Sequence, residues 1–160
     1  MNNIYLLTGG NLDNRLQNLQ KAFTLIDEMA GNVIAKSAIY ETAAWGVTNQ
    51  PSFLNQVLLC TTQFTAEQLL QTILLIEKQM GRERIEKLGP RIIDIDVLFY
   101  NDEIIDLPEL KVPHPEIANR RFVLEPLHEI APNYIHPVLK KTIANLLKDC
   151  SDPLEVRMLE

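Results

Sequence analysis

The sequence predicts an α+β fold: a ferredoxin-like β-α-β-β-α-β core, with an antiparallel sheet on which helices pack and a C-terminal extension on the same core. Two observations carry this prediction. Runs rich in β-branched and aromatic residues alternate with segments whose apolar residues recur every three or four positions. The length of 160 residues suits one hydrophobic core, so we expect a single domain over residues 1–160.

The first half of the predicted core is a strand, a helix and two further strands. Residues 4–8 form a short apolar run that two glycines end, which predicts a strand. Residues 16–29 repeat apolar side chains at helical spacing and lie just before a glycine stop. Residues 33–40 and 53–62 are rich in β-branched and apolar residues and predict two strands, separated by a polar, proline-containing loop over 41–52.

The second half of the predicted core is a helix followed by a strand. Thr65 and Gln68 stand at the spacing of a capping box, and apolar residues then recur at helical spacing until Gly81 ends the pattern. Residues 92–99 are dominated by β-branched and aromatic residues and predict a strand. Prolines punctuate the chain after it, which predicts short strands and short helices, the last helix near residues 139–148.

Composition places the protein among soluble globular proteins. Apolar residues make up 46% and charged residues 22%, which is ordinary for that class. The net charge of −6 argues against a protein that binds nucleic acid or an anionic membrane. Two cysteines are too few for a disulfide framework, and the N-terminus lacks the basic start and apolar run of a signal peptide. We therefore expect a cytoplasmic protein.

Two aspartates inside the predicted strand at 92–99 are the most specific chemical feature. Asp94 and Asp96 stand at i and i+2, so they share one face of the strand, with Cα atoms about 6.5–7 Å apart. Carboxylates at that spacing can converge on a pair of hard cations, the arrangement used for phosphoryl chemistry. The other interpretation is a solvated outer face of an antiparallel strand. An arginine delivered by the preceding Gly-Pro turn favours the site.

The run from Gly89 to Tyr100 also resembles the signature of a known family. Gly-Pro-Arg, two residues, Asp, one apolar residue, Asp and an apolar-aromatic tail are similar to the 6-hydroxymethyl-7,8-dihydropterin pyrophosphokinases, and further matches extend from about residue 4 to about residue 137. The resemblance implies a kinase of folate biosynthesis that transfers diphosphate from ATP to the hydroxymethyl group of the pterin, giving AMP. It implies two Mg²⁺ ions held by Asp94 and Asp96, and catalysis by these two residues with Arg82 and Arg91.

Basic residues gather just before the acid pair, at Arg82, Arg84, Lys87 and Arg91. The plain interpretation is a solvated charged loop. The alternative is a cationic lid over a triphosphate, because guanidinium groups match phosphate oxygens and offset the charge of the transferring group. The resemblance implies that this loop closes over ATP and that Arg82, Arg84 and Arg91 bind it. Leu88 stands where relatives carry tryptophan, and neither it nor Lys87 receives a role.

Three further residues are candidate ATP contacts. Glu77 falls on the apolar face of its predicted helix, where it either snorkels at the edge of the apolar stripe or is an acid of the site. His114 on its own would be a structural histidine. However, Pro-His-Pro followed by Asn-Arg-Arg-Phe, ending at Phe122, resembles the second recognisable block of the family. The resemblance implies that Glu77, His114 and Arg120 bind ATP, while Lys111 departs from the family pattern.

Aromatic and amide side chains could form a slot for a flat heterocycle. Asn55 offers a donor and an acceptor together, and two aromatic rings can sandwich a planar bicycle. Taken alone, aromatic residues at strand starts usually belong to the core. The resemblance implies a pterin slot, whose substrate-binding residues are Thr42, Ala43, Ala44, Trp45, Phe53, Asn55 and Phe122. Gly9-Gly10-Asn11 fits no phosphate-loop pattern, so we interpret this turn as structural.

Two other classes of function stay open on the residues alone. A ferredoxin-like binding or regulatory module would need neither Mg²⁺ nor two aspartates on one strand. A metal-dependent phosphohydrolase would use the same acid pair without a pterin, and would normally have more histidine or carboxylate ligands than the sequence offers. The partners we expect are ATP and 6-hydroxymethyl-7,8-dihydropterin, with no nucleic acid and no membrane. A monomer and a homodimer both stay open.

Overall fold

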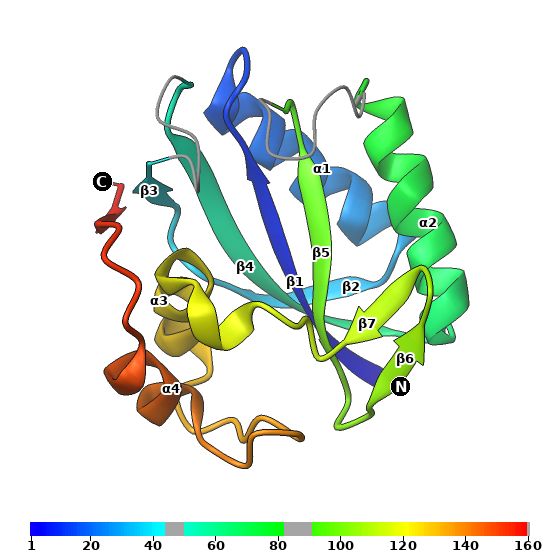
Figure 1. Ribbon diagram of the computed structural model, residues 1–160. Coiled ribbons are helices and arrows are strands. Elements are labelled where there is room, and N and C mark those ends of the chain that lie inside the picture. The colour runs from blue at the N-terminus through cyan, green and yellow to red at the C-terminus, as the bar shows by residue number, and fades with distance from the viewer. Residues whose placement is uncertain (44–49, 82–90, 160) are drawn as a thin grey trace.

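The computed structural model describes residues 1–43, 50–81 and 91–159, and these residues form a mixed α/β fold (Figure 1). The strands of the main sheet neighbour one another in the order β5 (Asp94–Tyr100), β1 (Asn2–Gly10), β4 (Phe53–Thr62), β3 (Tyr40–Thr42) and β8 (Val156–Met158). β2 (Asn32–Lys36) pairs with β4 as well. Every pairing in this sheet is antiparallel. The predicted antiparallel sheet is therefore confirmed.

Helices cover both faces of this sheet (Figure 1). The described α-helices are α1 (Arg15–Met29), α2 (Ala66–Gln79), α3 (Arg121–Ile130) and α4 (Ile143–Asp149). A short 3-10 helix, η1 (Ile117–Asn119), and a hairpin of β6 (Ile105–Leu107) and β7 (Leu110–Val112) lie between β5 and α3 in the chain. None of the helices in the described ranges has the length and apolar character that crossing a bilayer requires.

The core has two parts, one on each face of the sheet. Ile4 and Leu6 of β1 pack with residues of α1 and α2, whereas Tyr5 and Leu7 pack with residues of α3 and α4. This division follows from the alternation of side chains along a strand, because successive residues of β1 face opposite helices. The central strand is apolar on both faces for the same reason.

The first two predicted helices begin and end close to their observed bounds. The predicted capping box is confirmed: Gln68 N donates to Thr65 Oγ1 at 3.2 Å, and Thr65 N donates to Gln68 Oε1 at 3.0 Å. Asn14 caps α1 in a simpler way, since its side chain accepts a hydrogen bond from Gln17 N at 3.0 Å. In both helices a local side chain satisfies a backbone N–H of the first turn, which has no partner within the helix.

The single strand predicted over residues 33–40 is wrong. The chain forms two strands there, β2 and β3, which pair with different parts of β4. Ser37 lies between them, buried, and its Oγ accepts a hydrogen bond from Val57 N at 3.0 Å while its own N–H donates to Val57 O at 2.9 Å. Side-chain hydrogen bonds of this kind compete with a regular ladder, so the strand is interrupted at Ser37.

The last helix also begins later than predicted. Residues 139–142 are not helical, and α4 begins at Ile143 after Thr142, whose side chain accepts a hydrogen bond from Asn145 N at 3.2 Å. His136 holds the preceding turn, because its Nδ1 accepts hydrogen bonds from Val138 N and Leu139 N at 3.2 and 3.0 Å. These contacts give His136 a structural role.

Candidate active site

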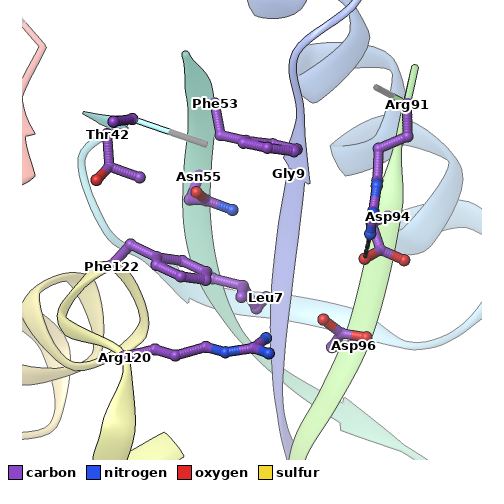
Figure 2. Close-up of a pocket in the computed structure, with 11 residues that line it drawn as sticks. Leu7, Gly9, Thr42, Phe53, Asn55, Arg91, Asp94, Asp96, Arg120 and Phe122 are labelled. Atoms are coloured by element: carbon purple, nitrogen blue, oxygen red, sulfur yellow. Dashed lines mark hydrogen bonds and ion pairs between the residues drawn. The ribbon is translucent and has the colours of Figure 1, made fainter. Parts of the chain in front are cut away.

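The two aspartates of the acid pair lie on β5 with Ile95 buried between them (Figure 2). Both are half-buried, and both line the same cavity. β1 holds the strand in register, with Gly9 opposite Asp94 and Leu7 opposite Asp96. The pair therefore faces a cavity and is not a fully solvated strand face.

Glu77 is a third carboxylate beside the pair. It is 4% exposed, and its Oε2 accepts a hydrogen bond from Ile95 N at 2.8 Å. Ile95 lies between Asp94 and Asp96 in the chain, so this bond ties α2 to the centre of the acid pair. The interpretation of Glu77 as a side chain that snorkels into solvent is wrong, because the carboxylate is buried and hydrogen-bonded to β5.

The electrostatics of the site concentrate on Asp96. Burial raises the pKa of its carboxyl to about 7, and the negative charges of Asp94 and Glu77 act in the same direction. Arg120 and Arg91 oppose this shift without cancelling it. A group of carboxylates in this state favours a bound cation, because a positive charge would let Asp96 ionise at neutral pH.

Two arginines connect the acid pair to aromatic side chains. Arg91 Nη1 donates to Asp94 Oδ2 at 2.9 Å, and its guanidinium carbon lies 5.8 Å from the centre of the Phe53 ring. The guanidinium carbon of Arg120 lies 5.8 Å from the centre of the Phe122 ring. Figure 2 shows the Arg120 side chain extended toward β5. Positive charge thus lies between the acids and both rings.

A slot for a flat molecule opens beside the acids. Phe53 of β4 and Phe122 of α3 form its two sides, Thr42 lines it, and Figure 2 shows Asn55 between the rings. Asn55 is 5% exposed, and its Nδ2 donates to Thr8 O at 3.4 Å. Within the described ranges no group donates to Asn55 Oδ1. A buried acceptor in this state is suited to a ligand that carries an N–H donor on its edge.

A second cavity, of about 520 Å³, shares Asp96 with the slot. Glu77, Lys111 and His114 line it together with apolar side chains that include Ile95. His114 Nδ1 accepts a hydrogen bond from Glu116 N at 3.1 Å, and burial lowers the pKa of the imidazole, with the Arg120 charge acting in the same direction. The volume lies within the range of small-molecule and cofactor sites.

Comparison with known proteins shows the family to which this chain belongs. The family model of 7,8-dihydro-6-hydroxymethylpterin-pyrophosphokinase (HPPK) matches residues 5–132. The protein belongs to the HPPK family. Over 143 residues it is 43% identical to the 2-amino-4-hydroxy-6-hydroxymethyldihydropteridine pyrophosphokinase of Aquifex aeolicus, with 89% of each chain covered. It is 40% identical to the protein of the same name from Synechocystis sp., with 89% of this chain and 74% of the relative covered.

Solved structures that contain an HPPK unit share the fold. A crystal structure of wild-type Plasmodium falciparum HPPK-DHPS matches 92% of this chain with a TM-score of 0.74 at 21% identity. A triple mutant of the same protein matches 92% with a TM-score of 0.77 at 20% identity. This chain spans 43% of the length of each of those chains. At this level of identity the likeness shows the fold alone.

Most residues predicted for the HPPK site lie at the two cavities. Those lining the slot are Thr42, Ala43, Phe53, Asn55, Arg91, Asp94, Asp96, Arg120 and Phe122, and those lining the second cavity include Glu77, Asp96 and His114. Six residues considered from the sequence lie outside the described residues: Ala44, Trp45, Arg82, Arg84, Lys87 and Leu88.

Gly9 and Asn11, which the sequence predicted only as parts of a structural turn, also shape the site. A Cβ atom at Gly9 would lie 2.1 Å from Asn55 Nδ2, so glycine makes room for the amide in the slot. Asn11 is 2% exposed, with Nδ2 donating to Gln50 Oε1 at 2.7 Å and Oδ1 accepting from Arg91 N at 2.9 Å. Asn11 thus joins the chain before β4 to the chain before β5. A polar residue directly after two glycines was the available signal.

Proposed function

We propose that this HPPK family member transfers the diphosphate of ATP to the hydroxymethyl group of 6-hydroxymethyl-7,8-dihydropterin, in folate biosynthesis. The products are AMP and the pterin diphosphate. Family membership supports the activity. The observation that carries the proposal for this chain is that Asp96 lines both cavities, one an aromatic slot and the other large enough for a nucleotide. Two substrates bound there would meet at the acid pair.

The slot is suited to the pterin. Its two phenylalanine rings can hold a planar bicycle between them. Asn55 Oδ1, which accepts no hydrogen bond from the described part of the chain, can receive an N–H of the pterin edge. By the family resemblance, Thr42 to Trp45 contribute to the same pocket, of which Thr42 and Ala43 line the described slot. We assign Phe53, Asn55 and Phe122 to pterin binding on these grounds.

The second cavity is suited to the nucleotide. Its apolar side chains can hold a base, and its lining includes Glu77 and His114, for which the family resemblance implies ATP contacts. The resemblance implies the same for Arg120, which lines the adjoining slot. Arg91, already paired with Asp94, stands where a guanidinium can face phosphate oxygens. We assign Arg82 and Arg84 to the same phosphates by resemblance. In the transfer, the pterin hydroxyl gives its proton to water and attacks the β-phosphorus, while the bond from that phosphorus to the α-phosphate oxygen breaks and AMP leaves.

The acid pair fits Mg²⁺. Carboxylate oxygens are the protein ligands that Mg²⁺ prefers, and the pKa of Asp96 is raised by burial and by neighbouring negative charge that a cation would neutralise. In the described part of the chain, no three histidine, cysteine, aspartate or glutamate side chains form a metal cluster. We propose two Mg²⁺ ions held by Asp94 and Asp96, with phosphate oxygens and water as the other ligands. Bound in this way, Mg²⁺ would neutralise charge on the triphosphate.

Three finer assignments belong to the same proposal. The strand order β5-β1-β4-β2, antiparallel throughout, supports a ferredoxin-like core. Helices on both faces of one sheet support a single domain over residues 1–160. The composition and the low cysteine content support a cytoplasmic location.

The experiment that tests the proposal measures AMP formed from Mg-ATP with and without 6-hydroxymethyl-7,8-dihydropterin. We expect AMP only when the pterin is present, and none after the metal is chelated. ADP and phosphate formed without pterin would replace the proposal with a phosphohydrolase. An absence of both turnover and pterin binding would replace it with a binding module.

A further inference from the structure

We propose that the C-terminal segment, residues 150–159, is a positioning element of the slot that fixes the distance between its two aromatic walls. One wall carries Phe122 and the other carries Thr42 and Phe53. The inference rests on the proposed function, because it states what positions the pterin in that slot. The segment lies beyond residues 5–132, which the family model matches, and it contributes none of the described residues that line the two cavities.

One end of the segment is bound to the first residue of α3. Arg121 N donates to Asp152 Oδ2 at 3.0 Å, while Arg121 Nε and Nη2 donate to the carbonyl oxygens of Asp152 and Cys150 at 3.3 and 2.9 Å. Asp152 is 6% exposed. The residue before α3, Arg120, gives the helix no side-chain cap. Asp152 supplies that cap from a distant part of the chain, directly beside Phe122.

The other end of the segment extends the sheet at the opposite wall. β8 pairs with β3, with Val156 opposite Thr42 and Arg157 opposite Glu41. Thr42 Oγ1 donates to Glu155 O at 2.9 Å. Figure 1 shows the segment, in red, running from α4 past α3 to the edge of the sheet. The Thr42 side of the slot is therefore bound to the same ten residues as the Phe122 side.

Glu41 on β3 links the segment to the residue before Phe53 through hydrogen bonds. Glu41 accepts hydrogen bonds from Arg157 Nη2, Arg15 Nη1 and Ser52 Oγ, each at 2.9 Å. These bonds lower the pKa of Glu41 to about 2, so the group is charged throughout the working pH range. Ser52 directly precedes Phe53, the residue that forms this wall. Glu41 thus joins β8 to the start of β4.

The far end of α3 is held to the same sheet edge independently. Glu129 Oε1 accepts hydrogen bonds from Ala38 N at 3.1 Å and from Tyr40 OH at 2.7 Å. α3 is therefore attached at its C-terminal end through Glu129 and at its N-terminal end through the segment. Releasing the segment frees the end of α3 that carries Phe122, while the helix as a whole stays docked. The expected loss is in pterin binding and not in folding.

The test breaks the β3–β8 ladder with one proline and uses a neighbouring proline as its control. Leu159 N donates to Ile39 O at 2.7 Å. Backbone N–H groups alternate in direction along an antiparallel ladder, so the N–H of Arg157 also faces β3, whereas the N–H of Met158 faces away. Arg157→Pro removes a ladder donor, whereas Met158→Pro does not. Arg157→Ala removes only the guanidinium. Asp152→Ala releases the other end of the segment.

We expect Arg157→Pro to raise the KM for the pterin about tenfold or more, with the KM for Mg-ATP changed less than about twofold. Met158→Pro should leave both constants within about twofold of the wild type. If the segment acts as one connection, Asp152→Ala and Arg157→Pro have non-additive effects on the pterin KM. The double variant should then have a pterin KM no higher than that of the more affected single variant.

Provided that the wild-type protein forms AMP only with pterin, three results would overturn the inference. They are an unchanged pterin KM in Arg157→Pro, an equal change in Met158→Pro, and full additivity in the double variant. If Asp152→Ala fails to fold, the comparison of the two prolines on the exposed strand decides. A wild type without pterin-dependent AMP would contradict the proposed function itself, so the two failures are distinguishable.

Discussion

Individual carboxylates of this protein are held in very different electrostatic states. Hydrogen bonds from three charged or polar donors lower the pKa of Glu41, whereas burial, together with the nearby charges of Asp94 and Glu77, raises the pKa of Asp96. The donors that stabilise the charge of Glu41 all belong to the chain itself. The buried, acidic surroundings of Asp96 favour a bound cation, which supports the proposed metal site.

The first prediction at this scale concerns Asp96. Asp96→Asn keeps the shape of the side chain and removes its charge, so we expect kcat for AMP formation to fall about a hundredfold or more. Asp106→Asn is the matched control, because Asp106 lies on β6 with its side chain 79% exposed. It should keep the activity of the wild type. Full activity of Asp96→Asn with Mg-ATP would exclude a catalytic role for this carboxylate.

A second prediction concerns the pH dependence of stability through His136. Burial lowers the pKa of this imidazole. Its Nδ1 accepts two backbone hydrogen bonds, and its ring packs edge-on against Phe99. The unfolded chain therefore takes up the proton more readily, so the free energy of unfolding falls as pH drops through the unfolded pKa of about 6.5.

Urea unfolding of the wild type and of His136→Asn between pH 8 and pH 5.5 checks this expectation. Asparagine keeps an acceptor and does not titrate, so the variant should lose less stability over this range. Equal losses in the two proteins would show that another group carries the pH dependence.

At the scale of single elements, local sequence patterns predicted a helix or strand correctly where the contacts that stabilise it are local. The start of α2 could be predicted because Thr65 and Gln68 satisfy each other's backbone groups within one turn. The break between β2 and β3 could not be predicted, since Ser37 is held by Val57, twenty positions away. β8 was missed for the same reason, because its three residues become a strand only through pairing with β3.

The capping box yields the prediction at this scale. Thr65→Ala removes the acceptor for Gln68 N, and we expect the free energy of unfolding to fall by about 1 kcal/mol. Thr72→Ala, in the middle of the same helix, is the control. Among the described residues its hydroxyl bonds only to Gln68 O, and alanine has the higher helix propensity, so stability should hold or rise slightly. Urea unfolding measures the free energy of unfolding of both variants. Equal losses of stability in the two would contradict a capping role for Thr65.

At the scale of the whole molecule, the site brings together residues that are far apart in the chain. The acid pair could be predicted from its spacing, and the pterin-binding roles proposed for Phe53, Asn55 and Phe122 came from the family resemblance. Nothing in the sequence placed the residues of β3 beside those of β8, or Glu77 against Ile95, because strand order and helix docking arise from packing of the whole core. The two-walled slot is a property of this arrangement.

The last prediction follows from that arrangement. A pterin in the slot would contact β4 of the sheet and the start of α3, and so should stabilise the folded protein. At a concentration of 100 times Kd the stabilisation is about 2.7 kcal/mol, which corresponds to a rise in Tm of about 5–10 °C for a domain of this size. Thermal unfolding with and without 6-hydroxymethyl-7,8-dihydropterin measures it.

Two phenylalanine variants separate binding in the slot from binding elsewhere. Phe122→Ala removes one wall, so the shift in Tm at the same pterin concentration should largely disappear. Phe23→Ala removes a ring of α1 that packs against the other core, so it should lower the Tm of the free protein and leave the pterin-induced shift intact. If Phe122→Ala kept the full shift, the pterin would have to bind outside the slot between Phe53 and Phe122.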